Sequence, residues 1–353
     1  MILTVTLNAA LDVTYVVDAL VPHQVHRVRD VAEHAGGKGI NVARLLHALG
    51  KPVVATGLVG GHTGERIADL LVAEGIPAEF GEIAAESRRT VVVNSGGDAT
   101  GFWEPGPFVD DAEWGAFTEL YGTLLAGADV VVLSGSLPRG VPADAYGRMV
   151  RVAKRADVPV VLDADGEPLR HGLAAGPTVV KPNSDELAAV VGHRPSGVAE
   201  VASAAAQLRK AGAEVVVASL GPHGLVAATG EGAWRAAVPP QTGNPTGAGD
   251  AVVAALARSL ARANHGTSRY TPPPLTARPE EREAATVCGQ FAVSGGGRQQ
   301  FGHKPRVVWA EVLADAAALS GAAVLAPVAG VVDLAVYRRL RGQVEIEPVG
   351  GIG

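Results

Sequence analysis

The chain has 353 residues, which is enough for one large α/β domain or two smaller ones with a sizeable core. Its formal net charge of −6 gives no broad basic field, so nucleic acid is disfavoured as a partner. Cys288 is the single cysteine, which excludes an internal disulfide framework and favours a reducing compartment.

The termini give no sign of export or membrane insertion. Residues 1–7 are apolar but carry no basic leader or signal-peptidase pattern, so we expect them to form a first strand. The longest apolar run, residues 322–336, is interrupted by Pro327 and Asp333 and is too short for a membrane span. These features predict a cytoplasmic protein that does not enter a membrane.

Two segments in the first third predict a small separate sheet. Asp12 follows the first strand, at the edge where open α/β sheets bind ligands, and residues 13–35 then alternate loosely as a half-exposed ribbon does. Short β segments at 78–83, 89–94 and 100–104 resemble the rest of that sheet. We therefore expect an inserted β lid made of about 13–35 and 78–104.

Arg88 and Arg89 stand at the start of one lid strand. An arginine pair on an exposed ribbon is usually solvated. It is also what a phosphate-bearing substrate requires, because a guanidinium binds phosphate through two parallel hydrogen bonds.

Residues 36–50 form a glycine-rich start to a helix that ends at Gly50. The stretch is not a P-loop, because no Ser or Thr follows Lys38. Lys38 and Asn41 lie three positions apart and can face one ligand. Judged from the local pattern alone, the sequence favours a solvated lysine at Lys38 and a helix cap at Asn41.

From residue 113 onward, strands and helices alternate regularly. This rhythm predicts a parallel, doubly wound sheet with right-handed crossovers. Polar residues follow the ends of the expected strands, where such a sheet places its ligand crevice. They are Asp12, Ser134, Ser136, Asp163, Asn183, Glu186 and Ser219. Each alone is explained by a turn or a cap, so their coincidence carries the argument.

Residues 244–251 are rich in small side chains and lead into an apolar helix at 252–260. The N–H groups of Ala248, Gly249 and Asp250 have no carbonyl partner within that helix, so they form an anion site. A carboxylate at Asp250 can accept a proton from a hydroxyl beside a phosphoryl group held there. The alternative is that Asp250 only caps the helix.

The last part of the chain carries fewer signals. Residues 264–283 predict a surface loop, residues 282–293 a helix, and 295–297 a glycine run. Residues 322–353 form a tail to which we assign no role. We treat 1–353 as a single domain with the lid inserted in it.

Together these motifs resemble the ribokinase-like (PfkB) sugar kinases, in the branch of 1-phosphofructokinase and tagatose-6-phosphate kinase. The resemblance covers roughly residues 1–302, and its motifs appear in the family's order. They are Thr6-Leu7-Asn8 with Asp12, Gly36-Gly37-Lys38-Gly39-Ile40-Asn41, Arg88, Glu104-Pro105-Gly106-Pro107, Ser134-Gly135-Ser136, Lys181-Pro182-Asn183 with Glu186, Ser219-Leu220-Gly221, and Gly247-Ala248-Gly249-Asp250.

The resemblance implies a three-layer, mostly parallel α/β fold with a small β lid. It implies that Asp250 is the general base and that Gly247, Ala248 and Gly249 hold the transferring phosphoryl group. The substrate residues that it implies are Asp12, Gly37, Lys38, Asn41 and Arg88. Its nucleotide residues are Lys181, Asn183, Ser219, Gly221 and Gly224.

ATP and Mg²⁺ are the implied cofactors, with Asn183 and Glu186 organising the metal through water. Phosphoryl transfer needs positioning and charge stabilisation more than covalent help, so an anion site, a metal and a base suffice. A metal that bridges phosphates needs only one or two carboxylate contacts, which fits Asn183 and Glu186.

We therefore expect ATP-dependent phosphorylation of a ketohexose phosphate, either fructose 1-phosphate, tagatose 6-phosphate or fructose 6-phosphate, to the bisphosphate. Lys38 and Arg88 favour a phosphorylated substrate, because a neutral sugar leaves both cations unpaired in a closed site. This branch usually has other residues at the positions of Ala10, Thr90, Trp103 and Thr246, so the sugar stays open.

Two alternatives remain at this point: a kinase of an unphosphorylated sugar or nucleoside, and a non-catalytic sugar- or nucleotide-binding module. A dinucleotide binder is disfavoured, because no glycine-rich phosphate turn follows the first strand. A binding module has no use for Asp250 at the anion site. The exposed lid also favours a homodimer paired through its strands.

Overall fold

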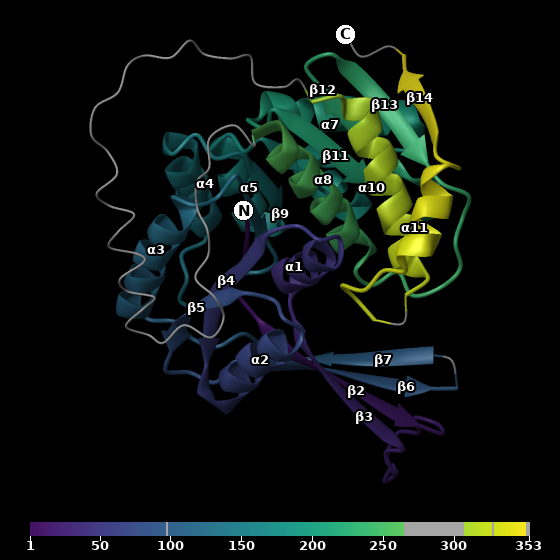
Figure 1. The fold of residues 1–353 in the computed structure, drawn as a ribbon. Coiled ribbons are helices and arrows are strands. Elements are labelled where there is room, and N and C mark those ends of the chain that lie inside the picture. The colour runs from purple at the N-terminus through teal and green to yellow at the C-terminus, as the bar shows by residue number, and fades with distance from the viewer. Residues whose placement is uncertain (97, 265–306, 327, 351–353) are drawn as a thin grey trace.

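A ten-stranded sheet runs through the middle of the molecule in this computed structural model, which describes residues 1–96, 98–264, 307–326 and 328–350 (Figure 1). Seven neighbouring strands pair in parallel: β5, β4, β1, β8, β9, β10 and β11. Beyond β11, the strands β12, β13 and β14 each pair antiparallel with the strand before them. In spatial order the ten strands are β14 (Glu345–Val349), β13 (Gly232–Ala237), β12 (Leu225–Thr229), β11 (Val215–Ser219), β10 (Val179–Val180), β9 (Val160–Asp163), β8 (Val130–Ser134), β1 (Ile2–Thr6), β4 (Val53–Gly60) and β5 (Ala78–Ile83).

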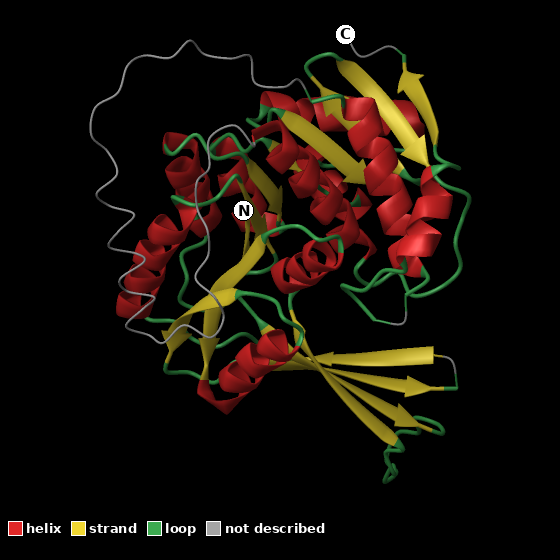
Figure 2. Cartoon of the chain, in the orientation of Figure 1, coloured by secondary structure: helices red, strands yellow, loops and turns green. Residues whose placement is uncertain are grey.

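The parallel strands consist largely of β-branched residues because helices cover both of their faces. One face carries α1 (Lys38–Ala48), α2 (Gly61–Ala73), α8 (Ala248–Asn264) and α10 (Trp309–Val324). The other carries α3 (Asp111–Leu125), α4 (Ala145–Arg155), α5 (Gly166–Ala174), α6 (Ser184–Val191) and α7 (Gly197–Lys210). The expected three-layer, doubly wound, mostly parallel fold is confirmed (Figure 2).

The strand order changes direction at β1, which pairs with β4 on one side and with β8 on the other. At such a point the connections leave toward opposite faces and open a crevice at the carboxyl ends of the strands. Ser134 and Asp163 are the last residues of β8 and β9, and Ser219 is the last residue of β11. These three polar residues therefore line one edge of the main sheet, whereas Asp12 lies in a second sheet.

A separate four-stranded sheet forms the lid and projects from the main body (Figure 1). Its strands, in spatial order, are β3 (Asp30–Gly36), β2 (Ala10–Val17), β6 (Arg88–Ser95) and β7 (Asp98–Trp103). The assignment of 78–83 to the lid was wrong: β5 lies parallel to β4 at the edge of the main sheet. Helix α2 connects β4 to β5, and such a crossover places the second strand parallel beside the first.

The tail also has a defined place in the fold. Helix α11 (Leu334–Arg341) packs on α10, and β14 extends the main sheet by pairing with β13. Before α11, Ala329 and Gly330 lie against Gly247 and Asn41. Part of the tail therefore borders the residues that resemble a kinase site.

The surface loop predicted at 264–283, apart from its first residue, lies outside the described residues, as do the helix at 282–293 and the glycine run. Among the helices that the structure does describe, none has the length and hydropathy needed to span a bilayer.

Candidate active site

Asp250 lies in the first turn of α8 with its side chain buried inside the protein. Its Oδ2 accepts a hydrogen bond of 2.9 Å from Nδ2 of Asn41, on α1. The amide of Asn41 is oriented in turn by Arg44, whose Nη1 donates to Asn41 Oδ1 at 3.3 Å. The carboxylate of Asp250 thus contacts a second helix, and the simple cap reading does not account for this contact.

The pKa of Asp250 is raised from 3.8 to about 7. Burial is the main cause, because a carboxylate loses its hydration there, and the negative charge of Asp163 adds to it. The hydrogen bond from Asn41 and the charges of Lys38 and Lys181 oppose this shift without cancelling it. A carboxyl group with a pKa near neutrality is suited to take up a proton during a reaction.

The glycine-rich turn before α8 approaches its neighbours closely. Gly247 has a φ of +85°, and a Cβ there would lie 2.9 Å from Cα of Ala329. The N–H of Ala248 donates at 3.2 Å to the carbonyl of Pro245, which precedes α8, so this donor is satisfied by the turn and not by the helix. The N–H groups that the start of α8 can offer to an anion are therefore those after Ala248, at Gly249 and Asp250.

Lys181 follows β10 and brings a positive charge to the glycine-rich turn and first residues of α8, residues 244–250, which we call the anion loop. Its side chain is only 4% exposed, and its Nζ lies 3.6 Å from the position a Cβ would take at Gly249. Nζ also forms an ion pair of 3.2 Å with Oδ1 of Asp163. A phosphoryl group at the start of α8 would meet main-chain donors and an ammonium group together.

Asp163 is the site residue that the sequence analysis did not assign a role. Its carboxylate is buried, pairs with Lys181, lies 3.5 Å from Nζ of Lys38, and accepts from Oγ of Ser134 at 3.3 Å. Burial alone would raise its pKa, but the two ammonium groups outweigh burial and lower it. Its position at the end of β9 was the available signal.

Lys38, at the start of α1, is half-exposed, and its ion pair with Asp163 is long. Burial lowers its pKa, but attraction by Asp163, Glu186 and Asp250 outweighs burial and raises it. The carboxylates that act on Lys38 thus surround the start of α8. The charges that act on Lys38 belong to residues around the anion loop, and Arg88 is not among them.

Asp12 and Arg88 occupy neighbouring strands of the lid, β2 and β6. Asp12 pairs across the strands with Thr90, and Nε of Arg88 donates to the carbonyl of Asn8 at 3.3 Å. Burial raises the pKa of Asp12, against the hydrogen bond from Thr90 and the charge of Arg88. Asp12 lies on a lid strand and not merely after β1, so lid movement would carry it.

Two glycines permit the lid strand and α1 to meet at this point. A Cβ at Gly36 would lie 2.2 Å from Oδ2 of Asp12, and one at Gly37 would lie 2.6 Å from Cγ2 of Thr6. Gly37 also has a φ of +111°, in the region that favours glycine. These close approaches are structural reasons for glycine, and they leave the backbone of Gly37 beside the crevice.

Asn183 and Glu186 form the cap of α6. Oδ1 of Asn183 accepts from the N–H groups of Asp185 and Glu186, and Oε2 of Glu186 accepts from N of Asn183 at 2.8 Å. This arrangement commits the Asn183 oxygen but leaves Oε1 of Glu186 outside the cap. No described group of three or more His, Cys, Asp or Glu side chains could hold a metal by itself. The donor set fits Mg²⁺ that arrives with nucleotide phosphates and meets one carboxylate through water.

The remaining predicted residues lie around the end of β11. Asn183 and Ser219 form an isolated parallel β-bridge, and N of Ser219 donates to the carbonyl of Pro182 at 2.9 Å. Gly224 has a structural reason to be glycine, because a Cβ there would lie 2.3 Å from the carbonyl of Ala236. Gly221 has a φ of +56° and open space around its Cβ position. A groove for a nucleotide here would be bordered by backbone more than by side chains.

Comparisons with known proteins agree with this geometry. The pfkB family carbohydrate kinases match residues 4–271. Phosphofructokinase-2 from Escherichia coli, in a tetrameric inhibited form, is 26% identical over 97% of this chain and 98% of that one, with a TM-score of 0.79. Its complex with fructose-6-phosphate gives 26% identity over the same shares and a TM-score of 0.78.

A ribokinase from Arabidopsis thaliana, complexed with ribose and ATP, shares the fold at 21% identity, with a TM-score of 0.67 and coverage of 96% and 98%. The chain belongs to the pfkB family of carbohydrate kinases. It is a sugar kinase, a phosphotransferase with a hydroxyl group as acceptor, and kinases of this family use ATP and a divalent metal.

The raised pKa of Asp250 predicts a pH-dependent cost in stability. Above pH 7 the folded protein must hold a buried negative charge that the unfolded chain exposes to water, so Asp250→Asn should raise the free energy of unfolding by a few kcal/mol, on the order of 1.4 per unit of pKa shift. The gain should be largest above pH 7 and should vanish below pH 4, where the carboxyl is protonated in both states. Urea unfolding of both proteins at pH 4, 6 and 8 measures this; a gain independent of pH would contradict it.

Proposed function

We propose that the protein is an ATP-dependent kinase that phosphorylates a ketohexose phosphate, such as fructose 1-phosphate, fructose 6-phosphate or tagatose 6-phosphate, to the bisphosphate. The observation that carries the proposal is the buried Asp250, with its pKa at about 7, beside the donors at the start of α8. A hydroxyl oxygen placed between them attacks the terminal phosphorus of ATP. As the new O–P bond forms, the O–P bond to ADP breaks and the hydroxyl proton passes to Asp250.

Lys181 and Lys38 supply the positive charge that the transferring phosphoryl group needs. Both ammonium groups already lie around Asp163, and Lys181 is held against the anion loop. Glu186 would hold Mg²⁺ through water, and the bound ion would neutralise charge on the nucleotide phosphates. Ser219, Gly221 and Gly224 would border the nucleotide, with Asn183 holding α6 in place beside them.

Arg88 supports the phosphorylated class of substrate. Asp12 would bind sugar hydroxyl groups from the same lid face, and Gly37 and Asn41 would contact the sugar from the start of α1. Burial lowers the pKa of Arg88, and among the residues that the structure describes it is the charge of Asp12 that favours the ionised form. A sugar phosphate would supply a second negative partner in a half-closed site. The similarity to a phosphofructokinase that binds fructose-6-phosphate points the same way.

The test is a panel of acceptors with ATP and Mg²⁺: the three ketohexose phosphates, the free hexoses and a nucleoside. We expect turnover of one or more phosphorylated sugars, with Arg88→Gln raising KM for the sugar much more than for ATP. The exposed Arg155→Gln on α4 is the matched control and should leave both unchanged. Turnover confined to a free sugar or a nucleoside would replace this proposal with its alternative.

The role of Asp250 has its own test in the same assay. Asp250→Asn should lower kcat roughly 100- to 10,000-fold while ATP still binds, because a general base typically contributes that much. In the parent protein, kcat/KM should fall about tenfold per pH unit below pH 7, where Asp250 becomes protonated. Equal rates for parent and variant would exclude Asp250 as the general base.

We also propose that two copies pair through their lids. Val31 of β3 and Phe102 of β7 lie on one face of the lid and are 54% and 55% exposed. Free strand edges and exposed apolar side chains favour a second sheet as partner, and one phosphofructokinase-2 structure is tetrameric. Light scattering should give a dimer or larger mass for the parent and a monomer for Val31→Asp. Val72→Asp, at an exposed position on α2, is the control; a monomeric parent would contradict the proposal.

A further inference from the structure

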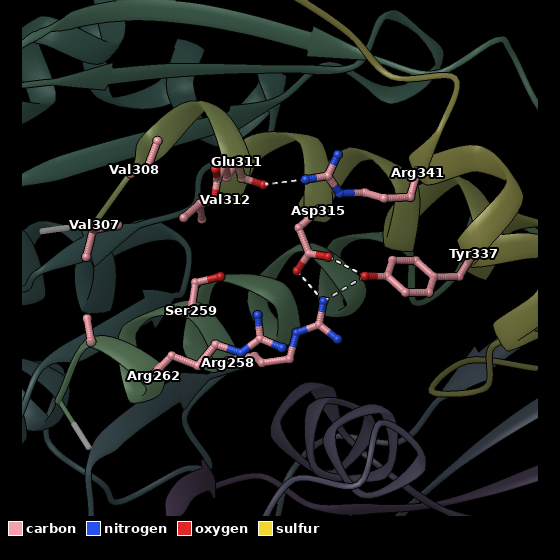
Figure 3. A pocket seen from close by; sticks show the side chains of 11 residues that line it. Arg258, Ser259, Arg262, Val307, Val308, Glu311, Val312, Asp315, Tyr337 and Arg341 are labelled. Atoms are coloured by element: carbon pink, nitrogen blue, oxygen red, sulfur yellow. Dashed lines mark hydrogen bonds and ion pairs between the residues drawn. The ribbon is translucent and has the colours of Figure 1, made fainter. Parts of the chain in front are cut away.

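A second cavity lies away from the candidate active site, between α8, α10 and α11 (Figure 3). Its volume is about 420 Å³, within the range of small-molecule sites. Three arginines line it: Arg258 and Arg262 from α8, and Arg341 from α11. Val308 and Val312 form an apolar side. The pocket shares no residue with the sites assigned above.

Arg258 is the anchor of this cavity. Its side chain is only 6% exposed, yet it pairs with Asp315 through Nη2 and donates to the hydroxyl of Tyr337 at 2.9 Å. Cζ of the guanidinium lies 5.6 Å from the centroid of the Tyr337 ring, within the range of a cation–π contact. Tyr337 in turn donates to the other oxygen of Asp315. The carboxylate of Asp315 is thus shared between two internal donors.

One donor of this buried cation remains unused. Nε of Arg258 is buried and has no hydrogen-bond partner among the residues that the structure describes. A buried N–H of a charged group is costly to leave unpaired, so such an atom marks a place where a partner belongs. Nε itself lies below the cavity surface, so an anion in the cavity offsets the charge of Arg258 without contacting this atom.

The two other arginines add positive charge that the local acids do not neutralise. Arg262 is exposed, and Arg341 makes only a 3.5 Å contact to the main-chain carbonyl of Glu311. Neither forms an ion pair within the described part of the chain. Glu311 lines the cavity but is exposed to solvent, and Asp315 is already engaged. The cavity therefore presents a surplus of guanidinium groups.

We propose that this cavity binds a small organic anion through a phosphate or carboxylate group. The oxyanion accepts from the guanidinium groups of Arg262 and Arg341, since arginine forks match the geometry of both oxyanions, and the charge of Arg258 beneath them adds to the attraction. The organic body of the ligand packs on Val308 and Val312. The cavity is thus a ligand site separate from the one that binds the phosphoryl donor and acceptor.

Both walls of the cavity lead to the anion loop. Arg258 lies eight residues along α8 from Asp250, about 12 Å at 1.5 Å per residue. The segment that leads into α11 places Ala329 against Gly247 and Gly330 against Asn41. A ligand that draws Arg341 toward Arg258 acts on both elements, so it changes the affinity of the active site for nucleotide. Bound nucleotide then changes the affinity of the cavity for the ligand by the same factor.

Calorimetric titration tests the site with two probes, inorganic phosphate and malonate, on protein saturated with Mg²⁺ and a non-hydrolysable ATP analogue. The parent should bind at least one probe at this cavity, and the two arms tell phosphate from carboxylate recognition. The double variant Arg262→Ala/Arg341→Ala should weaken binding at least about tenfold, because charge-assisted hydrogen bonds are lost. Arg338→Ala/Arg339→Ala removes the same charge from exposed positions of α11 outside the cavity and should leave binding unchanged.

No binding of either probe to the parent, or equal affinities in both double variants, would overturn the site. The nucleotide affinity measured with and without the bound probe tests the coupling, and an unchanged value would remove it. These readouts report binding and need no phosphoryl transfer, so they stand or fall separately from the proposed function.

Discussion

The structure depends on how two buried carboxylates, Asp163 and Asp250, are kept inside one crevice. Asp163 receives both nearby ammonium groups, Lys38 and Lys181, and its pKa is lowered. Asp250 receives a neutral amide from Asn41, and its pKa is raised to about 7. The pKa values of two aspartates are thus shifted in opposite directions by their surroundings. In this way a single site obtains one permanently charged carboxylate and one proton acceptor.

The sheet topology brings these groups together. Asp163 and Lys181 follow adjacent parallel strands, β9 and β10, so they arrive at one edge. Asn41 and Asp250 come from α1 and α8, which pack side by side on one face of the sheet. The lid carries Asp12 and Arg88 over the same edge. The residues to which the proposed function assigns the sugar, the phosphoryl group and the proton therefore lie near the edge where the strand order changes direction.

Much of the fold was predictable, because regular alternation of strands and helices has few topological solutions. Asp250, Asn41 and Lys181 were predictable as site residues because they stand in short motifs at strand ends or helix starts. The membership of 78–83 in the main sheet was not, since a short β segment gives no sign of which neighbour it pairs with. The same limit applies to β14, whose partner β13 lies more than a hundred positions away.

Contacts between distant segments account for the other differences. The attraction of Lys38 to Asp163 and the packing of Ala329 on Gly247 arise from the folded chain and leave no local pattern. The arginine-lined cavity is another such case, since Arg258 and Arg341 come from helices separated by most of the last third of the chain. Local motifs identified the chemistry, and the packing determined the protonation states.

The central claim is that Asp250 is a buried carboxyl group poised to accept a proton. Its ¹³Cγ resonance, assigned by comparison with Asp250→Asn and followed by NMR against pH in the ligand-free protein, measures this directly. The account predicts a titration midpoint at about 7. A midpoint near 3.8, the value of an ordinary aspartate, would contradict it.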